Sequence, residues 1–209
     1  DDDLMLRCKT GEWFYDNPQR GRANNSIKLL KSELTREEFY SYKDSIKQFG
    51  EPGIVLVDDI DFCTNPCGEI GFIPVNKNTG NSCISFCNLN EINGAYCTTT
   101  AKFYEACRNA SILGTLQASY TNMPFLGQDT KELIEEEALI GVSITGIMDN
   151  PKILLNPEVL RRGAEIVNET NELIAKIIGI NPAARTTTVK PSGNASVILG
   201  TASGIHPAH

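Results

Sequence analysis

The sequence predicts an α/β fold built on parallel strands, and two observations carry this prediction. Short apolar runs at 53–58 and 140–146, bounded by turn residues, are typical of buried strands. Longer segments with helical spacing of apolar residues, at 100–119 and 156–178, alternate with them. Strands that alternate with helices in this way favour a parallel sheet. Because no linker or internal repeat interrupts the pattern, we expect residues 1–209 to be one domain or part of one.

Local signals define the elements of the first quarter of the chain. The first thirty residues predict loop with a short strand. Residues 35–38 form a capping box, Thr-Arg-Glu-Glu, so a helix should begin there, run to about Gln48 and end at Gly50. The continuous apolar run at 53–58 then predicts a strand that is buried on both faces.

The middle of the chain predicts loops followed by two helices. Residues 61–97 hold five cysteines together with Pro, Gly and Asn, which indicates loop and short strand. A helix over 100–119 should follow, and a second should open at Asp129 with acidic residues near its positive end. The residues expected on the buried stripe of the first helix are Phe103, Ala106, Cys107, Ala110, Leu113 and Leu116.

The last third of the chain predicts a strand, a long helix and a final strand. The strand is the apolar run at 140–146. Asn156 as cap and Pro157 at the first helical position open the long helix, and Gly179 closes it. The β-branched run 186–189 predicts a strand that leads directly into a Ser/Gly/Asn loop and a further helix.

Composition excludes several classes of function. The chain has 19 basic and 26 acidic residues, a formal charge of −7, which argues against binding a nucleic-acid polymer. No apolar run is long enough for a membrane span, and the acidic opening is unlike a signal peptide. Seven cysteines, an odd number in a chain of this length, indicate reduced thiols and a cytoplasmic location.

The two ends of the chain suggest a fragment. The sequence opens on Asp1 and stops at Ile-His-Pro-Ala-His without closing an element. We therefore expect a piece of a larger protein, or one segment of an interrupted coding region.

The segment Asn65-Pro66-Cys67-Gly68-Glu69 is the first candidate for chemistry. It places an amide, a thiol and a carboxylate at a tight tip, because Pro fixes one backbone angle and Gly allows a turn. A neighbouring carboxylate is a poor companion for a thiolate nucleophile. It suits a neutral S–H that must lose a hydrogen atom, and it could act as a general base toward a substrate hydroxyl. A turn with a buried cysteine is the alternative interpretation.

A metal site and a phosphate site are two further possibilities. Cys63, Cys67, Cys83 and Cys87 form two C-x-x-x-C pairs that superficially resemble a four-thiolate zinc site, although common zinc modules use shorter spacers; we expect no metal. We expect Cys97 and Cys107 to be core residues. The segment 190–196, Lys-Pro-Ser-Gly-Asn-Ala-Ser, joins a strand to a helix start, where exposed amides favour phosphate; any capped helix would look similar.

Taken in order, several segments resemble the catalytic subunit of ribonucleotide reductase. The form they resemble most is the adenosylcobalamin-dependent (class II) ribonucleoside-triphosphate reductase. The segments are 65–69, 87–93, 190–193 and 202–207, with supporting matches at 9–13, 24–27 and 141–147. The resemblance implies that this chain is a central fragment of a ten-stranded α/β barrel, with a finger loop through its centre, and that the N-terminal and C-terminal parts are missing.

The resemblance implies roles for individual residues. Cys67 would become the thiyl radical that takes the 3′ hydrogen of the ribose, Glu69 would accept the 3′-hydroxyl proton, and Asn65 would hydrogen-bond the ribose hydroxyls. Cys87 would be one of two thiols that reduce the 2′ position, with Cys83 as the runner-up. The amides and hydroxyls expected to bind the nucleotide phosphates belong to Ser192, Gly193, Asn194, Ala195 and Ser196.

Cofactor and partners also come from the resemblance. Adenosylcobalamin would be the radical source in the complete enzyme, a thioredoxin-like or dithiol reductant would recharge it, and a ribonucleoside tri- or diphosphate would be the substrate. The family's second redox cysteine lies upstream of the tip, where Cys63 is too close and Cys8 has a different context. A class I diphosphate reductase subunit and a zinc-stabilised interaction module remain alternatives.

Overall fold

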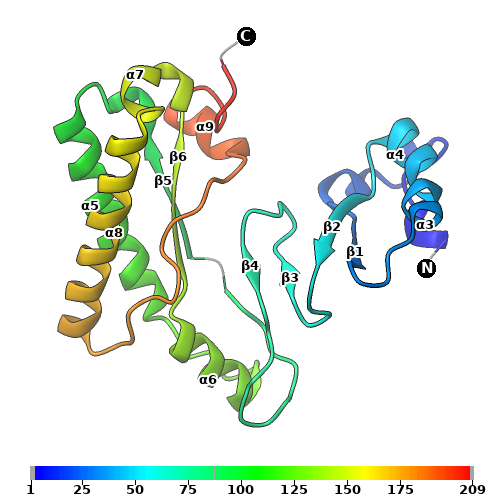
Figure 1. Ribbon diagram of the computed structural model, residues 1–209, viewed down its shortest axis with the longest axis horizontal. Coiled ribbons are helices and arrows are strands. Elements are labelled where there is room, and N and C mark those ends of the chain that lie inside the picture. Colours follow the sequence, from blue (N-terminus) through cyan, green and yellow to red (C-terminus); the bar gives the residue numbers. More distant parts are fainter. Residues whose placement is uncertain (1–2, 87, 208–209) are drawn as a thin grey trace. The chain divides into compact units, whose positions relative to one another are not determined.

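A computed structural model describes residues 3–86 and 88–207 of the chain (Figure 1). It divides into two compact units, Asp1–Ile73 and Pro74–His209. Each unit contains a parallel strand pair together with helices, so the predicted α/β class is confirmed.

The N-terminal unit consists of short helices and two small sheets. Its elements are α1 (Asp3–Leu6), α2 (Trp13–Asp16), η1 (Pro18–Arg22), β1 (Ser26–Leu30), α3 (Arg36–Ser41), α4 (Lys43–Phe49), β2 (Gly53–Val57), β3 (Cys63–Thr64) and β4 (Gly71–Phe72). Strands β1 and β2 run parallel, with Ser26 opposite Gly53 and Leu30 opposite Val57. Strands β3 and β4 form a short antiparallel hairpin.

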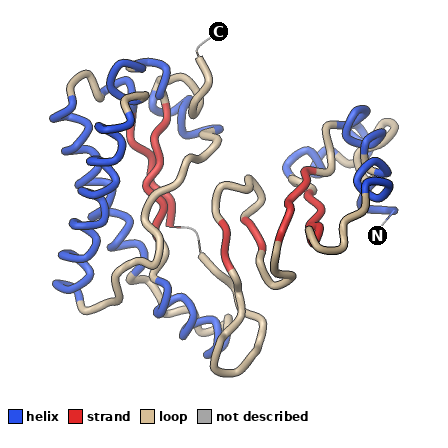
Figure 2. The backbone as a smooth tube through the Cα atoms, in the orientation of Figure 1, coloured by secondary structure: helices blue, strands red, loops and turns tan. Residues whose placement is uncertain are grey.

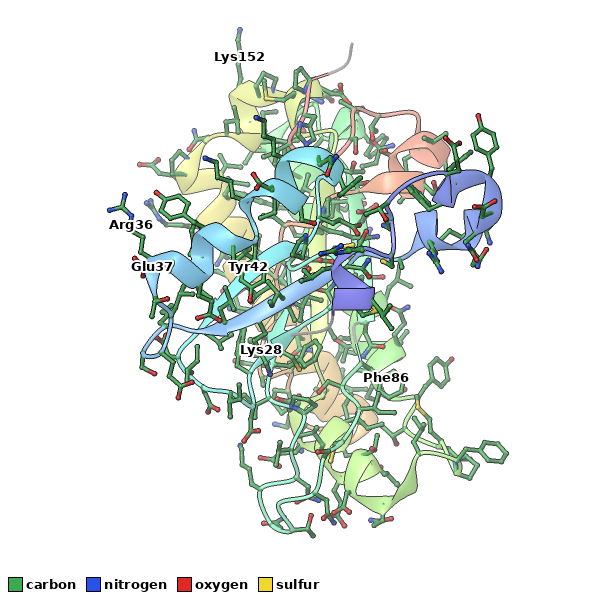
Figure 3. All side chains as sticks on the ribbon, turned by 90° about the vertical axis from the view of Figure 1, so that its right-hand side faces the viewer. Lys28, Arg36, Glu37, Tyr42, Phe86 and Lys152 are labelled. Carbon is green, nitrogen blue, oxygen red and sulfur yellow. The ribbon has the colours of Figure 1, made fainter. Side chains whose placement is uncertain are left out.

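The single helix predicted from residue 35 is two helices, α3 and α4. Its ends are as predicted: Thr35 Oγ1 accepts a hydrogen bond from the Glu38 amide at 3.1 Å, and Gly50 closes α4 with a φ of 73°. The break falls at Tyr42, whose side chain is 6% exposed and is the only buried one between 36 and 49. We attribute the break to the burial of this ring. Arg36, the first residue of α3, extends outward (Figure 3).

Strand β2 lies where the sequence predicts it, but the prediction that both its faces are buried is wrong. Val57 is 2% exposed, whereas Leu56 is 45% exposed. Among the described residues β2 pairs with β1 alone, so this sheet has two strands. The exposure of Leu56 shows that one face of β2 is open to solvent.

The C-terminal unit packs two long helices against a parallel strand pair. Its elements are β5 (Asn88–Asn93), η2 (Gly94–Tyr96), α5 (Thr100–Ala118), α6 (Gly127–Glu137), β6 (Ile140–Thr145), η3 (Ile147–Asp149), α7 (Pro151–Leu154), α8 (Pro157–Ile178) and α9 (Gly193–Leu199). Strands β5 and β6 pair from Asn88 opposite Ile140 to Asn93 opposite Thr145. Figure 1 shows α5 and α8 side by side on one side of these strands, with α9 beyond the other side.

The bounds of α8 agree with the prediction at both ends. Asn156 Oδ1 accepts hydrogen bonds from the amides of Glu158 at 3.0 Å and Val159 at 3.3 Å. Gly179 ends the helix in the left-handed conformation, with a φ of 78°. Residues of its buried face join a core that reaches across α5 to β5 and β6.

The buried face of α5 is only partly as predicted. Phe103, Cys107 and Ala110 are buried. Leu113 and Leu116, which the spacing places on the same stripe, are 58% and 42% exposed. The helix therefore turns a different face toward α8 at its C-terminal half.

Polar side chains fill that part of the interface between α5 and α8. Ser111 and Thr115 are fully buried, and Ser111 Oγ donates to the Val167 carbonyl at 2.7 Å. Asn171 Nδ2 donates to Thr115 Oγ1 at 2.9 Å, and Asn171 Oδ1 accepts from the Ala183 amide at 2.8 Å. Because each of these buried polar atoms has a hydrogen-bond partner, Ser111 and Thr115 can face α8. The apolar spacing of the sequence predicts Leu113 and Leu116 on that face instead.

The predicted strand at 186–189 is a single bridge and not a strand. Thr187 pairs in parallel with Val142 of β6, and the rest of the segment runs alongside as loop (Figure 2). The amide of Lys190 donates to the Ser143 hydroxyl at 2.9 Å. The chain therefore leaves the ladder before a regular strand forms.

Cys97 and Cys107 are core residues, as predicted, at 0% and 2% exposure. Burial raises the pKa of the Cys107 thiol to about 12, so this group stays protonated. None of the helices in the described part of the chain combines the length and the apolar character needed to cross a membrane.

Candidate active site

The tip that carries Cys67 is the turn of the β3–β4 hairpin. The amide of Asn65 donates to the Ile70 carbonyl at 3.2 Å, and the amide of Gly68 donates to the Asn65 carbonyl at 3.0 Å. Gly68 has a φ of 80°, a conformation that glycine adopts without strain. The alternation of Pro and Gly therefore produces the tight turn that the sequence predicts.

The three functional groups of the tip differ in exposure. Cys67 is exposed at the end of the turn, whereas Asn65 and Glu69 are half-buried. Asn65 Oδ1 accepts a hydrogen bond from the Ile70 amide at 3.1 Å, which fixes the side chain and leaves its Nδ2 hydrogens for another acceptor. An amide donor and a carboxylate thus flank an accessible thiol, and the buried-cysteine interpretation of this turn is wrong.

Asn24 is a further side chain at the tip, and the sequence analysis gave it no role. Its Nδ2 lies 3.4 Å from the Pro66 carbonyl and 4.0 Å from Cys67 Sγ. The residue belongs to the Asn-Asn-Ser segment at 24–26, just before β1. That segment matched the resemblance, but nothing in its local pattern indicates a contact more than forty residues away.

The remaining candidate cysteines have different surroundings. Cys87 lies outside the described residues. Cys83 is half-buried, and its thiol donates to the Asn81 carbonyl at 3.4 Å. Burial raises the pKa of the Cys63 thiol, which the charge of Lys28 partly opposes. Within residues 3–86 and 88–207, no three His, Cys, Asp or Glu side chains gather as a metal site.

The predicted phosphate loop lies in the C-terminal unit, at the carboxyl ends of β5 and β6 (Figure 1). Asn93, the last residue of β5, donates through Nδ2 to the Leu199 carbonyl of α9 at 3.3 Å. Ligands of parallel α/β sheets usually bind at this edge. A Cβ atom at Gly193 would have no atom within 4 Å, so the start of α9 faces open space.

The hydroxyls of this loop are engaged inside the protein. Ser192 is fully buried and Ser196 is 3% exposed. Ser196 Oγ lies 2.7 Å from the Ser192 carbonyl and 2.8 Å from the Gly193 carbonyl, to either of which it can donate. The donors that remain for an anion are first-turn amides such as those of Asn194 and Ala195, which lack acceptors inside a helix.

Glu91 contacts this loop, and the sequence analysis assigned it no role. Its Oε2 accepts a hydrogen bond from Ser192 Oγ at 3.0 Å, and its side chain is 7% exposed. The signal that could have found it is a carboxylate inside a segment that otherwise pairs as a strand, since such a charge needs a partner.

Comparison with known proteins identifies relatives over nearly the whole chain. The chain is similar to adenosylcobalamin-dependent ribonucleoside-triphosphate reductases. The protein of that name from Lactobacillus acidophilus is 25% identical over 256 residues, covering 99% of this chain and 32% of the relative. That of Levilactobacillus brevis is 23% identical over 252 residues, covering 99% and 32%. No protein-family model matches.

A solved structure has a similar fold. A B12-dependent (class II) ribonucleotide reductase matches 99% of this chain with a TM-score of 0.62 and 22% identity, over 33% of its own length. The predicted resemblance to class II reductases is therefore confirmed by sequence relatives and by fold. The chain spans about a third of the length of the curated relatives it matches.

Proposed function

We propose that this chain is the central part of the catalytic subunit of an adenosylcobalamin-dependent ribonucleoside-triphosphate reductase. The complete enzyme would reduce ribonucleotides to 2′-deoxyribonucleotides for DNA synthesis. The proposal includes the ten-stranded α/β barrel, with the β3–β4 hairpin as its finger loop. The observation that carries it is the exposed Cys67 between Asn65 and Glu69 on a hairpin tip, in a chain similar to these enzymes over 99% of its length.

The tip residues would perform the first half of the reaction. A ribose C–H group is too weakly acidic to lose a proton to a side-chain base, so Cys67, as a thiyl radical, would take the 3′ hydrogen atom. Glu69 would then accept the 3′-hydroxyl proton as general base. Asn65, held by its Oδ1 contact to the turn, would use its Nδ2 hydrogens to orient the ribose hydroxyls.

Two thiols would supply the electrons for the second half. Replacement of the 2′-hydroxyl by hydrogen, with release of water, consumes two electrons and two protons, and oxidation of a dithiol to a disulfide provides both. We assign one thiol to Cys87 and keep Cys83 as the alternative. A thioredoxin-like or dithiol reductant would then reduce the disulfide, and we expect the complete enzyme to be cytoplasmic.

The cofactor follows from the need for a radical. No side chain generates one unaided, and adenosylcobalamin, when bound, supplies it. The exposure of Cys67 fits this requirement, because a thiol at the end of a tip can meet an external radical source. We assign no residue of this chain to hold the cofactor, and expect the remaining parts of the reductase to do so. The names of the relatives favour this class over a class I diphosphate reductase.

The substrate phosphates would bind at the loop that precedes and begins α9. Ser192, Gly193, Asn194, Ala195 and Ser196 form this site in our proposal. Amides of the first helical turn would donate to the anion, and the positive end of the helix would favour it. The buried hydroxyls of the two serines would act by shaping the loop.

The test is replacement of the tip cysteine in the complete enzyme. Cys67→Ser should abolish formation of deoxynucleotide from ribonucleoside triphosphate while nucleotide binding survives, because an O–H bond is too strong to yield the radical. Cys63→Ser is the matched control, since Cys63 lies in β3 of the same hairpin but away from its end. This control variant should keep its activity.

Either of two results would contradict the proposal. Turnover by Cys67→Ser near the wild-type rate would remove the radical role of the tip. Equal loss in Cys63→Ser and Cys67→Ser would indicate general damage to the hairpin and would leave no special role for the exposed thiol.

A further inference from the structure

Glu91 is a buried carboxylate near the carboxyl end of β5. Its side chain is only 7% exposed. A charge withdrawn from water is costly unless its partners compensate it. Its contacts therefore indicate what it does.

Both partners of this carboxylate come from the loop that leads into α9. Oε2 accepts a hydrogen bond from Ser192 Oγ at 3.0 Å, although the two residues are 101 positions apart. Oε1 lies 3.7 Å from Lys190 Nζ and has no hydrogen-bond partner among the described residues. One side chain thus holds two residues of the same loop.

The contact with Ser192 changes what this serine can do for its own helix. Ser192 occupies the cap position of α9, where a serine oxygen normally accepts a hydrogen bond from an amide of the first turn. Here its side chain makes no such bond and is directed to Glu91. The Ser192 carbonyl accepts from Ser203 Oγ at 3.2 Å, which fixes the loop from another side.

We propose that Glu91 is a positioning residue for nucleotide phosphate binding. By drawing the Ser192 hydroxyl away from α9 and holding Lys190 beside the loop, it keeps the first-turn amides of Asn194 and Ala195 open to the anion. Glu91 itself does not touch the phosphate, since like charges in contact repel each other. The inference rests on the proposed function and adds a residue outside the phosphate loop that prepares it.

The experiment measures the affinity of the complete enzyme for CTP and for cytidine, by calorimetry. Glu91→Ala frees the Ser192 hydroxyl to cap α9, so CTP should bind about tenfold more weakly, the scale of one helix-cap interaction. Cytidine has no phosphate, and its affinity should not change. Glu91→Gln retains an oxygen that accepts from Ser192 and should stay within about threefold of wild type, well inside one such interaction. Glu105→Ala, which removes an exposed carboxylate of α5, is the control.

A second substitution separates this role from simple structural support. In Glu91→Ala/Ser192→Ala the competing hydroxyl is gone, so this double variant should bind CTP more tightly than Glu91→Ala does, although it need not reach wild-type affinity. A residue that merely supports the fold would give a double variant at least as weak as the single one. Near-ultraviolet circular dichroism reports folding. Glu91→Asp, whose carboxylate is one methylene short of Ser192, repeats the comparison where the alanine variant does not fold.

The outcomes distinguish this inference from the function beneath it. Unchanged CTP affinity in folded Glu91→Ala, an equal loss for cytidine, or no recovery in the double variant overturns the positioning role alone. A wild-type complete enzyme that binds neither CTP nor any other ribonucleoside triphosphate overturns the proposed function, and this role with it.

Discussion

The ring of Phe103 occupies the space that a side chain at Gly163 would need. A Cβ atom at position 163 would lie 2.6 Å from Phe103 Cε1, 2.9 Å from Cζ and 3.2 Å from Cys107 Sγ. Phe103 and Cys107 are each 2% exposed, so neither can move into solvent. Helices α5 and α8 can therefore pack closely at this point because Gly163 has no side chain.

We predict that Gly163→Ala destabilises this helix pair. Helix propensity alone would favour alanine by about 1 kcal/mol. Overpacking a filled core costs about 1–3 kcal/mol, and the 2.6 Å approach indicates the upper part of that range. Amides of α5 and α8 in the complete protein should exchange with deuterium faster than in wild type. Phe103→Leu should partly rescue Gly163→Ala, and additive damage in the double variant would contradict the packing argument.

The predictability of the fold depended on how local each signal is. The ends of α8 were predicted because Asn156 and Gly179 act within one helical turn of themselves. The polar interface of α5 was not, because Ser111 is buried only through a carbonyl on α8 that the α5 sequence does not contain. Likewise, the sequence of residues 53–58 does not show which strand pairs with β2, which in the structure is β1.

The candidate site divides in the same way. The tip at 65–69 is five consecutive residues, so its chemistry and its turn are both visible in the sequence. The contact between Glu91 and Ser192 joins two segments 101 positions apart, and it decides which donors of the loop are available. The sequence predicts a phosphate loop at 192–196, and the structure adds that the hydroxyls of Ser192 and Ser196 already have hydrogen-bond partners inside the protein.

We predict that the two candidate redox cysteines respond differently to replacement. In the complete enzyme, Cys87→Ser should permit at most a single turnover, because each turnover needs the dithiol to which Cys87 contributes one thiol. Cys83→Ser should be much milder, since its thiol already donates within its own loop to the Asn81 carbonyl at 3.4 Å. Product formed per enzyme in a rapid-quench assay measures both. A normal Cys87→Ser variant beside an inactive Cys83→Ser would reverse the assignment.

We predict that Asp129 makes the stability of the loop at 76–81 depend on pH. Hydrogen bonds from Thr79 at 2.7 Å and Asn81 at 2.8 Å, together with one from Asn76, lower the pKa of this carboxyl from 3.8. A lowered folded-state pKa stabilises the contact above the unfolded value, and this stabilisation is lost as pH falls through the folded value. The neighbouring Glu132 also has a lowered pKa, through Gln128 first and then Asn76.

The measurement is hydrogen exchange of residues 76–82, corrected for the intrinsic rate at each pH. Protection in wild type should decline below pH 3.8, the ordinary pKa of an aspartate. Asp129→Asn loses an acceptor, so this loop should exchange several-fold faster at neutral pH, with little further change on acidification. Asp44→Asn, at an exposed aspartate of α4, is the control. Identical pH profiles for wild type and Asp129→Asn would show that the Asp129 carboxylate does not stabilise this loop.

We predict that Gly193→Val weakens nucleotide binding without unfolding the loop. Gly193 does not have a left-handed φ, and a Cβ there would have no atom within 4 Å, so the folded protein accepts the side chain. The amide of Gly193 already donates to the Pro191 carbonyl at 2.9 Å, so any anion would depend on the amides that follow. A branched side chain at this position would stand between them and the phosphate. Losing two or three charge-assisted hydrogen bonds would cost about 2–5 kcal/mol of binding.

Calorimetry of the complete enzyme with nucleotide, beside circular dichroism for folding, tests this prediction. Gly193→Ala is the matched variant, because its single methyl tests the space without the branch, and its loss should be smaller. The order of affinities should therefore be glycine, alanine, valine. A folded Gly193→Val enzyme with wild-type affinity would place the phosphate away from α9.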